Sequence, residues 1–169
     1  MFIAINFNED TRRRLVVFRD DLQTSSMSGN FSLPENIHLT LAFLGECDAE
    51  QTAAAKAVMG EIDFQLFEIR VERIGHFKRQ GGDIWWAGIK GTAPLTGLRQ
   101  RLTEGLGLQG FKLDTRKFSP HVTLGREIMT KASPWQIEAF GETVTKIDLM
   151  KSERIRGKLT YTAVYTKGT

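Results

Sequence analysis

A four-residue pattern occurs twice in the chain, as His-Leu-Thr-Leu at residues 38–41 and as His-Val-Thr-Leu at residues 121–124. In an extended strand, successive side chains point to opposite faces, so the histidine and threonine of each tetrad share one face and the aliphatic residues share the other. Each tetrad is therefore expected to be a strand with an apolar face toward a core and a polar face that carries an imidazole and a hydroxyl. Two such strands side by side would form a site with two histidines and two threonines.

The spacing of the two tetrads predicts a duplicated unit. They are 83 positions apart, and the same offset places the apolar run 2–4 on residues 85–87 and Leu15 on Leu98. A strand, a helix and a tetrad strand therefore recur in the same order at about the same spacing, which is the mark of an internal repeat. We infer two βαβ-type lobes related by a pseudo-twofold axis, with one histidine on each side of a shared site.

Hydrophobic periodicity and capping residues predict the other elements. Asn8 and Asp48 suit the caps of two helices, and Pro94 suits the first turn of a third. We also expect a loop over residues 25–30, because they are rich in serine, and a short helix near 134–140. The predicted strands are 2–7, 37–44, 65–77, 84–89, 120–126, 143–150 and 159–165.

Length and cysteine usage exclude several classes of protein. The 169 residues are enough for one domain with a substantial core, and the single cysteine, Cys47, cannot form an internal disulfide. The apolar start of the chain is too short for a signal peptide, and no apolar run approaches the roughly 20 residues that span a bilayer. We therefore expect a soluble cytoplasmic protein that works away from membranes.

The charge balance permits an anionic partner without requiring one. The net charge is +3 and the pI is about 9.1. Solvated surface charge explains such a balance equally well. The basic residues gather at positions 78–79, 99–101, 116–117, 126 and 151–158.

Two histidines and two threonines on facing strands suit acid–base chemistry at phosphorus. An imidazole has an unperturbed pKa of about 6.5, so near neutral pH one can be neutral while the other is protonated. One of His38 and His121 would take a proton from an attacking water while the other gives a proton to the leaving oxygen. Thr40 and Thr123 would bind the non-bridging phosphate oxygens, whose charge grows in the transition state. A single histidine on a strand is more often structural, and it is the repetition that favours catalysis.

The segments around the tetrads resemble the two signature motifs of the 2H phosphoesterases. Residues 36–46 read NIHLTLAFLGE and residues 118–126 read FSPHVTLGR. Within that superfamily they are most similar to the bacterial and archaeal RNA 2',3'-cyclic phosphodiesterases, formerly named 2'-5' RNA ligases. The similarity implies an α+β fold over residues 1–169, a single bilobal domain. Its two pseudo-twofold-related lobes would each be an antiparallel sheet with helices on the outside, and the active-site cleft would lie between them.

The resemblance also implies an activity. It is the metal-independent hydrolysis of a terminal 2',3'-cyclic phosphate on RNA, which opens the P–O3' bond and leaves a 2'-phosphomonoester without any cofactor. By similarity, His121 would activate the water and His38 would protonate the leaving oxygen, although the tetrads are too alike for the sequence itself to assign these roles. Two alternatives stay open: a 2'-5' RNA ligase that joins a 2',3'-cyclic phosphate to a 5'-hydroxyl, and a non-catalytic module that binds RNA ends. We expect the protein to act as a monomer.

Arg126 matches the arginine that follows the family's second motif. A guanidinium at this position could hold a phosphate through two donors. In a regular strand, however, Arg126 would point away from the face of His121. A bulge or strand end at Gly125 would bring it back.

The remaining aromatic and titratable residues are assigned to structure. Phe43, Trp85 and Trp86 are expected in the core, although either tryptophan could offer a stacking face for a base. His76 lacks a tetrad around it and is expected to be structural or exposed. Neither tetrad has a second histidine or a carboxylate at the spacing of a catalytic zinc site, so we predict no metal site.

Overall fold

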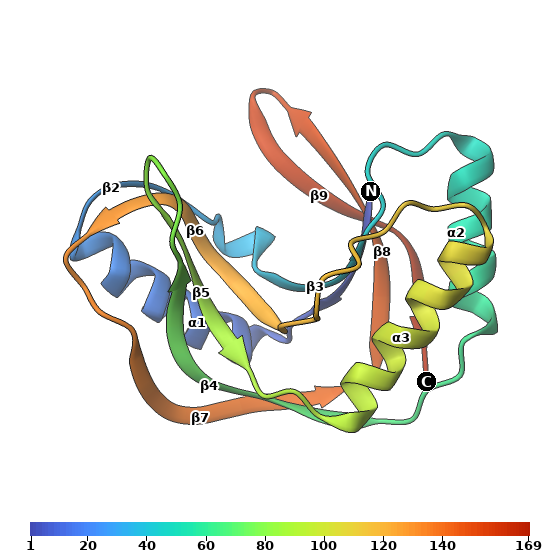
Figure 1. Ribbon diagram of the computed structural model, residues 1–169, viewed down its shortest axis with the longest axis horizontal. Helices are drawn as coiled ribbons and strands as arrows, with labels where there is room; N and C mark the ends of the chain where they lie inside the picture. Colours follow the sequence, from blue (N-terminus) through green and yellow to red (C-terminus); the bar gives the residue numbers. More distant parts are fainter.

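The computed structural model describes all residues, 1–169, and combines one large antiparallel sheet with three α-helices (Figure 1). This is the α+β class that the sequence predicts. None of the helices has the length and apolar character needed to span a bilayer. In chain order the elements are β1 (Phe2–Asn6), α1 (Glu9–Thr24), β2 (Ser26–Phe31), the 3-10 helix η1 (Pro34–Asn36), β3 (His38–Phe43), α2 (Ala49–Glu61), β4 (Phe67–Phe77), β5 (Asp83–Ile89), α3 (Ala93–Leu108), β6 (His121–Thr130), β7 (Trp135–Val144), β8 (Lys146–Ile155) and β9 (Lys158–Gly168).

The order of the strands shows two halves that mirror each other. The sheet runs β7-β4-β5-β6-β3-β1-β8-β9, and β2 pairs with β6 outside this path. From the middle outward, β6, β5, β4 and β7 in one half correspond to β3, β1, β8 and β9 in the other. Along this strand order, the halves are joined where β6 pairs with β3, through Leu39 and Val122. The two tetrad strands are therefore the junction of the molecule.

The 83-residue offset relates three elements of each half, although β2 and η1 of the first half have no counterpart in the second. It carries β1 onto β5, α1 onto α3 and β3 onto β6 within a residue or two at their starts. For the next element the same offset places α2 on β7, so a helix would correspond to a strand. The duplicated unit is therefore the strand, the helix and the tetrad strand, and the rest of each half has diverged.

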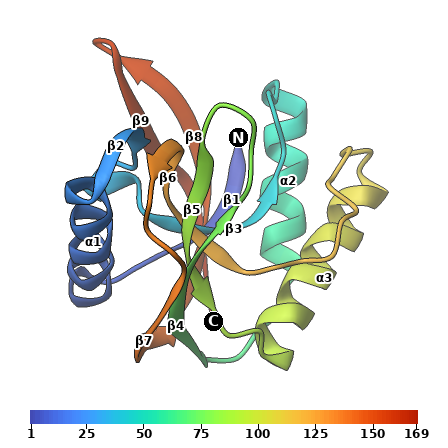
Figure 2. The ribbon, with the colours of Figure 1, turned by 60° about the vertical axis from the view of Figure 1, so that its left-hand side comes forward.

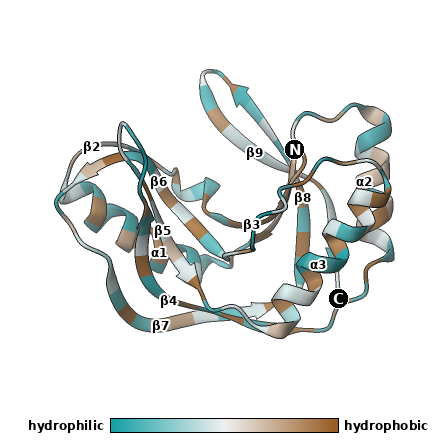
Figure 3. Cartoon of the chain, in the orientation of Figure 1, coloured by the Kyte–Doolittle hydropathy of each residue, from teal (hydrophilic) through white to brown (hydrophobic).

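The helices pack on the outside of the strands and close the core. α1 lies on one flank and contacts β2, β6 and β7, whereas α2 and α3 lie together on the other flank, with α3 against β3 (Figure 2). Each helix buries an aliphatic stripe at helical spacing, as predicted, and burial of each such side chain contributes about 1.5–3 kcal/mol. Figure 3 shows that hydrophilic positions occupy the tips of the β4–β5 and β8–β9 hairpins. The buried stripe residues are Leu15 and Leu22 in α1, Ala55, Val58 and Met59 in α2, and Leu95, Leu98, Leu102 and Leu106 in α3.

The predicted caps of the first two helices are confirmed. The side chain of Asn8 accepts a hydrogen bond from the backbone N–H of Thr11 at the start of α1. Asp48 and Gln51 form a reciprocal capping box at the start of α2. These bonds satisfy backbone donors that a helix start would otherwise leave unpaired.

The strand expected over residues 143–150 instead spans the end of β7 and the start of β8. Two further element predictions were wrong. Residues 25–30, expected as a loop, form most of β2, which pairs along β6 as an edge strand. Residues 134–140, expected as a short helix, belong to β7, which pairs with β4 from Phe67 to Ile74. In both cases a long partner strand offers a ladder of backbone hydrogen bonds, and this tertiary pairing overrides a weak local preference.

Candidate active site

The pairing of β3 with β6 brings the two tetrads together. Leu39 pairs with Val122, and both side chains are completely buried. In an antiparallel ladder this register sets His38 across from Thr123 and Thr40 across from His121, all four on the face opposite the core. The two histidines are then diagonal neighbours, whose Cα atoms lie about 7–8 Å apart in a regular ladder. This spacing leaves room for a small anionic group between the imidazoles.

Both imidazoles are anchored in the same way. His38 Nδ1 lies 2.7 Å from the carbonyl oxygen of Asn36, and His121 Nδ1 lies 2.7 Å from that of Ser119. A carbonyl can only accept, so each Nδ1 carries a hydrogen and donates it. Each ring therefore exchanges a proton at Nε2, which is an unprotonated acceptor while the imidazole is neutral. Asn36 and Ser119 are themselves related by the 83-residue offset, so the anchoring contact is part of the repeat.

The surroundings of the two rings differ. His38 is stacked on Phe2, with ring centroids 4.7 Å apart, and the edge of its ring faces Tyr161 at 5.4 Å. Its Nε2 lies 2.9 Å from the hydroxyl oxygen of Thr40. His121 meets the edge of Phe77 at 5.2 Å, and its Nε2 has no hydrogen-bond partner in the protein. The two tetrads thus carry the same groups in unlike settings.

The pKa of each histidine is lowered from its ordinary value. Burial is the main cause for both His38 and His121, because it disfavours the charged form, and the nearby Arg126 guanidinium acts in the same direction. The carbonyl that accepts from each Nδ1 opposes these effects. Both imidazoles are therefore neutral in the free protein at neutral pH. An anion bound between them would favour protonation of one.

A cleft with a volume of about 440 Å³ opens over the tetrads. Thr40, His121, Thr123 and Arg126 line it, whereas His38 is not one of the lining residues and is connected to the cleft through its contact with Thr40. The volume is within the range of pockets that hold small organic ligands, about 300–1,000 Å³. Its other walls are formed by the β4–β5 hairpin and by α3 with the segment that follows it. The cleft is thus large enough for a nucleotide and not only for a phosphate group.

Positive charge dominates the cleft. Four further basic side chains line it in addition to Arg126, whereas Asp114 is its only carboxylate. Arg116 donates hydrogen bonds to both oxygens of Asp114 and holds the pKa of that carboxyl down to about 2. A carboxylate paired in this way offers little repulsion to an anion. The four basic residues are Arg79, Arg99, Arg116 and Lys117.

A bulge in β6 turns Arg126 into the cleft. Trp86 pairs with Thr123 while Trp85 pairs with Gly125, so β6 advances two residues where β5 advances one. Because of this extra residue, the side chain of Arg126 lies on the same face of β6 as His121. It can bind a phosphate only from this face. Arg126 is exposed and makes no ion pair. Its guanidinium is therefore free to bind an anion.

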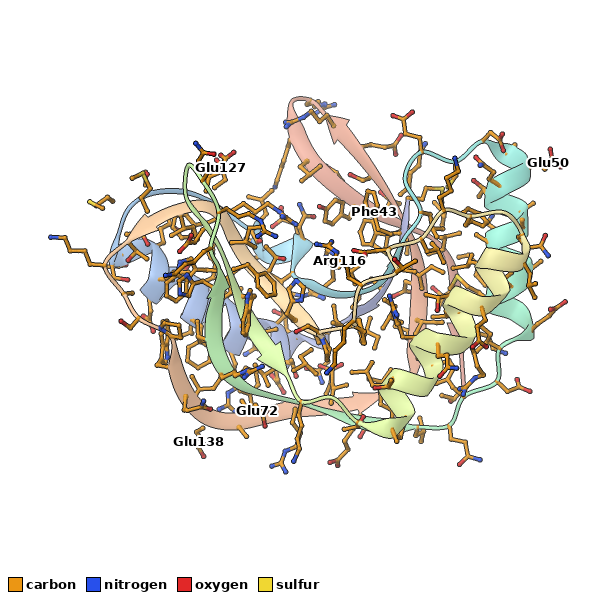
Figure 4. The ribbon with its side chains drawn as sticks, in the orientation of Figure 1. Phe43, Glu50, Glu72, Arg116, Glu127 and Glu138 are labelled. Atoms are coloured by element: carbon orange, nitrogen blue, oxygen red, sulfur yellow. The ribbon has the colours of Figure 1, made fainter.

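A corresponding bulge in β3 overturns the core prediction for Phe43. Ala4 pairs with Thr40 while Ile3 pairs with Ala42, so β3 also gains a residue. Phe43, which occupies the same repeat position as Arg126, turns into the cleft and is 66% exposed. Figure 4 shows Phe43 and Arg116 in the middle of the molecule, between the β4–β5 hairpin and the α2–α3 pair. Sequence reasoning missed this residue because strand parity gives no sign of a bulge.

The other structural assignments are confirmed. Trp85 is 1% exposed and Trp86 is 9% exposed. His76 is stacked on Trp85, with ring centroids 4.8 Å apart, and its Nδ1 is hydrogen-bonded to the carboxylate of Asp83 at 2.6 Å. His76 therefore joins β4 to β5 through contacts that do not involve the tetrads. No three His, Cys, Asp or Glu side chains gather as they would around a metal ion.

The antiparallel fold and the two His-x-Thr strands define the chain as a 2H phosphoesterase. Residues 19–156 match the sequence model described as the 2'-5' RNA ligase superfamily, and the chain belongs to this family.

Named relatives and solved structures agree with this assignment. The chain is 33% identical to an RNA 2',3'-cyclic phosphodiesterase of Archaeoglobus fulgidus over 150 residues, which cover 84% of each chain. It is 29% identical to an Escherichia coli protein of the same name, over 96% of this chain and 92% of that one. The crystal structure of E. coli LigT complexed with 3'-AMP superposes with a TM-score of 0.84 and 26% identity, covering 99% of this chain and 95% of the other. A structure described as a phosphoesterase gives a TM-score of 0.86 at the same identity and coverage.

Proposed function

We propose that the protein is an RNA 2',3'-cyclic phosphodiesterase that hydrolyses the terminal cyclic phosphate to a 2'-phosphomonoester without a metal ion. The observation that carries this proposal is the pair of imidazoles, His38 and His121, each anchored through Nδ1: His121 lines the basic cleft, and His38 contacts Thr40, which also lines it. Such a pair can supply one base and one acid to the same phosphorus atom. The names of the relatives support the same substrate.

In the proposed reaction, His121 accepts a proton from the attacking water and His38 donates a proton to the leaving oxygen. His121 Nε2, which is open to the cleft, takes a proton from water as the water oxygen forms a bond to phosphorus. The P–O3' bond breaks, and His38 Nε2 gives its proton to the leaving 3'-oxygen. Thr40 and Thr123 hold the non-bridging oxygens, and Arg126 offsets the charge that grows on them. The products are a 2'-phosphomonoester and a 3'-hydroxyl.

Binding of the substrate prepares the acid. His38 must be protonated to act, but its pKa is lowered in the free protein, first by burial and also by Arg126. The negative charge of the cyclic phosphate raises that pKa and offsets the effect of Arg126. Substrate binding therefore favours the protonated form of His38.

The site also supports the family's ligase reaction. If a 5'-hydroxyl replaces water as the nucleophile, the same acid and base join two RNA ends through a 2'-5' link. A non-catalytic module for RNA ends is a weaker alternative, because both histidines are anchored through Nδ1 and each leaves Nε2 for proton exchange. We further propose that one chain suffices, since every residue of the cleft comes from it. Its single cysteine fits work in the reducing cytoplasm.

The test is to incubate the purified protein with an oligonucleotide that ends in a 2',3'-cyclic phosphate, in EDTA, with and without a 5'-hydroxyl oligonucleotide. Phosphorus NMR and gel analysis identify the products. We expect the 2'-phosphomonoester as the main product in both cases. Predominant ligation would favour the ligase, and tight binding without turnover would favour the binding module.

A further inference from the structure

The cleft extends from the tetrads toward a wall that the proposed reaction does not use. This wall, which we call the α3 wall, consists of Arg99 on α3 and of Asp114, Arg116, Lys117 and Phe118 in the segment that leads to β6. Arg126, the cation assigned to the reacting phosphate, lies on β6 instead. The two groups of cations therefore come from different elements.

Arg99 is held in place before any ligand binds. Its guanidinium lies over the ring of Phe118, 5.0 Å from the centroid, and its Nη2 donates to the carbonyl oxygen of Asp114 at 3.2 Å. Its Nε is enclosed but has no hydrogen-bond partner, and no carboxylate lies within ion-pair distance. An arginine stacked on an aromatic ring loses little freedom when it binds an anion. Arg99 is thus an oriented cation with unused donors.

The α3 wall keeps a net positive charge. Arg116 is paired with Asp114 through NH···O contacts of 2.5 to 3.0 Å, so these two charges offset each other. Lys117 is exposed and makes no ion pair. Arg99 and Lys117 are therefore the two uncompensated charges of this wall. Together they suit one further anion beside the reacting phosphate.

We propose that the α3 wall binds the phosphodiester attached to the 5'-oxygen of the terminal nucleotide, so that the protein selects an RNA chain over an isolated cyclic nucleotide. This inference rests on the proposed function. When the cyclic phosphate on O2' and O3' lies between the two tetrads, the 5'-oxygen leaves the ribose on its other side. The phosphate attached there is the nearest further anion of the substrate.

The test compares three substrates that end in the same 2',3'-cyclic phosphate. The first is a nucleoside cyclic phosphate, the second is a dinucleotide, and the third is that dinucleotide with a neutral methylphosphonate in place of its internal phosphodiester. For the unmodified protein, we expect kcat/KM to be about tenfold higher for the charged dinucleotide than for the other two, as befits one charge-assisted contact. Arg99→Gln is expected to remove most of that preference.

Two further variants keep the test decisive. The control variant is Arg101→Gln. Arg101 lies on the same helix but donates to the carbonyl oxygen of Asp63 and does not line the cleft. This variant should prefer the charged dinucleotide as strongly as the unmodified protein does. If Arg99→Gln does not fold, Lys117→Gln changes only an exposed side chain and should lower the preference in the same direction. A nucleoside cyclic phosphate with a 5'-phosphate monoester should recover part of the gain, because the wall recognises the phosphate.

The outcomes separate this inference from the proposed function. Turnover of the nucleoside cyclic phosphate reports on the tetrads alone. Turnover of all three substrates at equal kcat/KM would overturn the α3-wall proposal and leave the activity intact. A preference that survives in the methylphosphonate, or in Arg99→Gln, would also overturn it. Absence of turnover with every substrate would instead refute the proposed function.

Discussion

At the scale of single residues, the repeat gives the two histidines the same anchor and different neighbours. Asn36 and Ser119 accept from Nδ1 of His38 and His121 at the same distance of 2.7 Å. Only His38 is stacked on an aromatic ring and bonded through Nε2 to a threonine, whereas the rings of Phe77 and Trp86 lie edge-on or tilted to His121. Two tetrads with the same histidine and threonine can therefore take different roles in one reaction, and the sequence by itself does not assign these roles.

Arg126 should contribute to the lowered pKa of both imidazoles. Burial is the main cause of their low pKa values, and Arg126 adds to it, so Arg126→Gln should raise the pKa of both His38 and His121. A base acts only above its pKa, so the acidic limb of kcat/KM should move to higher pH while kcat falls. NMR titration of the imidazole C–H signals measures the shift directly. Unchanged pKa values in the variant would show that Arg126 lies too far away to act on the rings.

Phe43 should contribute to substrate binding and hardly at all to stability. Its ring is 66% exposed in the cleft and offers a stacking face for a base, worth about 1–3 kcal/mol. Phe43→Ala should raise KM about fivefold or more and change the free energy of unfolding by less than about 0.5 kcal/mol. Leu108→Ala is the matched control, because Leu108 is 88% exposed outside the cleft. Equal KM values for both variants would exclude stacking on Phe43.

At the scale of elements, the sequence predicts what local pattern determines. The three long helices, two of their caps and the tetrad strands follow from periodicity and capping residues. β2 and β7 do not, because their pairing with β6 and β4 depends on strands distant in the sequence. The bulges that turn Phe43 and Arg126 into the cleft are pairing irregularities of the same kind. Only for Arg126 did the resemblance to a known motif indicate that a bulge was needed.

The β4–β5 hairpin should be intolerant of a side chain at Gly75. A Cβ atom there would lie 2.4 Å from the Trp86 ring, which forms one wall behind His121. Gly75→Ala should therefore lower the free energy of unfolding by about 1–3 kcal/mol. Gly107→Ala is the control in α3: a Cβ there meets nothing within 4 Å, and the change should stabilise by about 0.4–1 kcal/mol. Urea unfolding measures both, and equal stability of the two variants would contradict this packing.

At the scale of the whole molecule, the site belongs to neither half alone. Each half supplies one histidine and one threonine, and along the strand order the halves are joined through Leu39 and Val122. α1 packs against strands of the opposite half, which ties the two together. The basic cleft is thus formed by the assembly of both halves, and its chemistry depends on two imidazoles acting on one phosphorus atom.

The most direct measurement is the rate of cyclic phosphate hydrolysis in EDTA by His38→Ala, His121→Ala and the double variant. Each single change should lower kcat by about 10²- to 10⁴-fold. The double variant should be little slower than the worse single variant, because both groups serve the same step. His76→Gln, which changes the third histidine of the chain, should retain the rate of the unmodified protein. Wild-type hydrolysis by either folded single variant would contradict catalysis by the histidine pair.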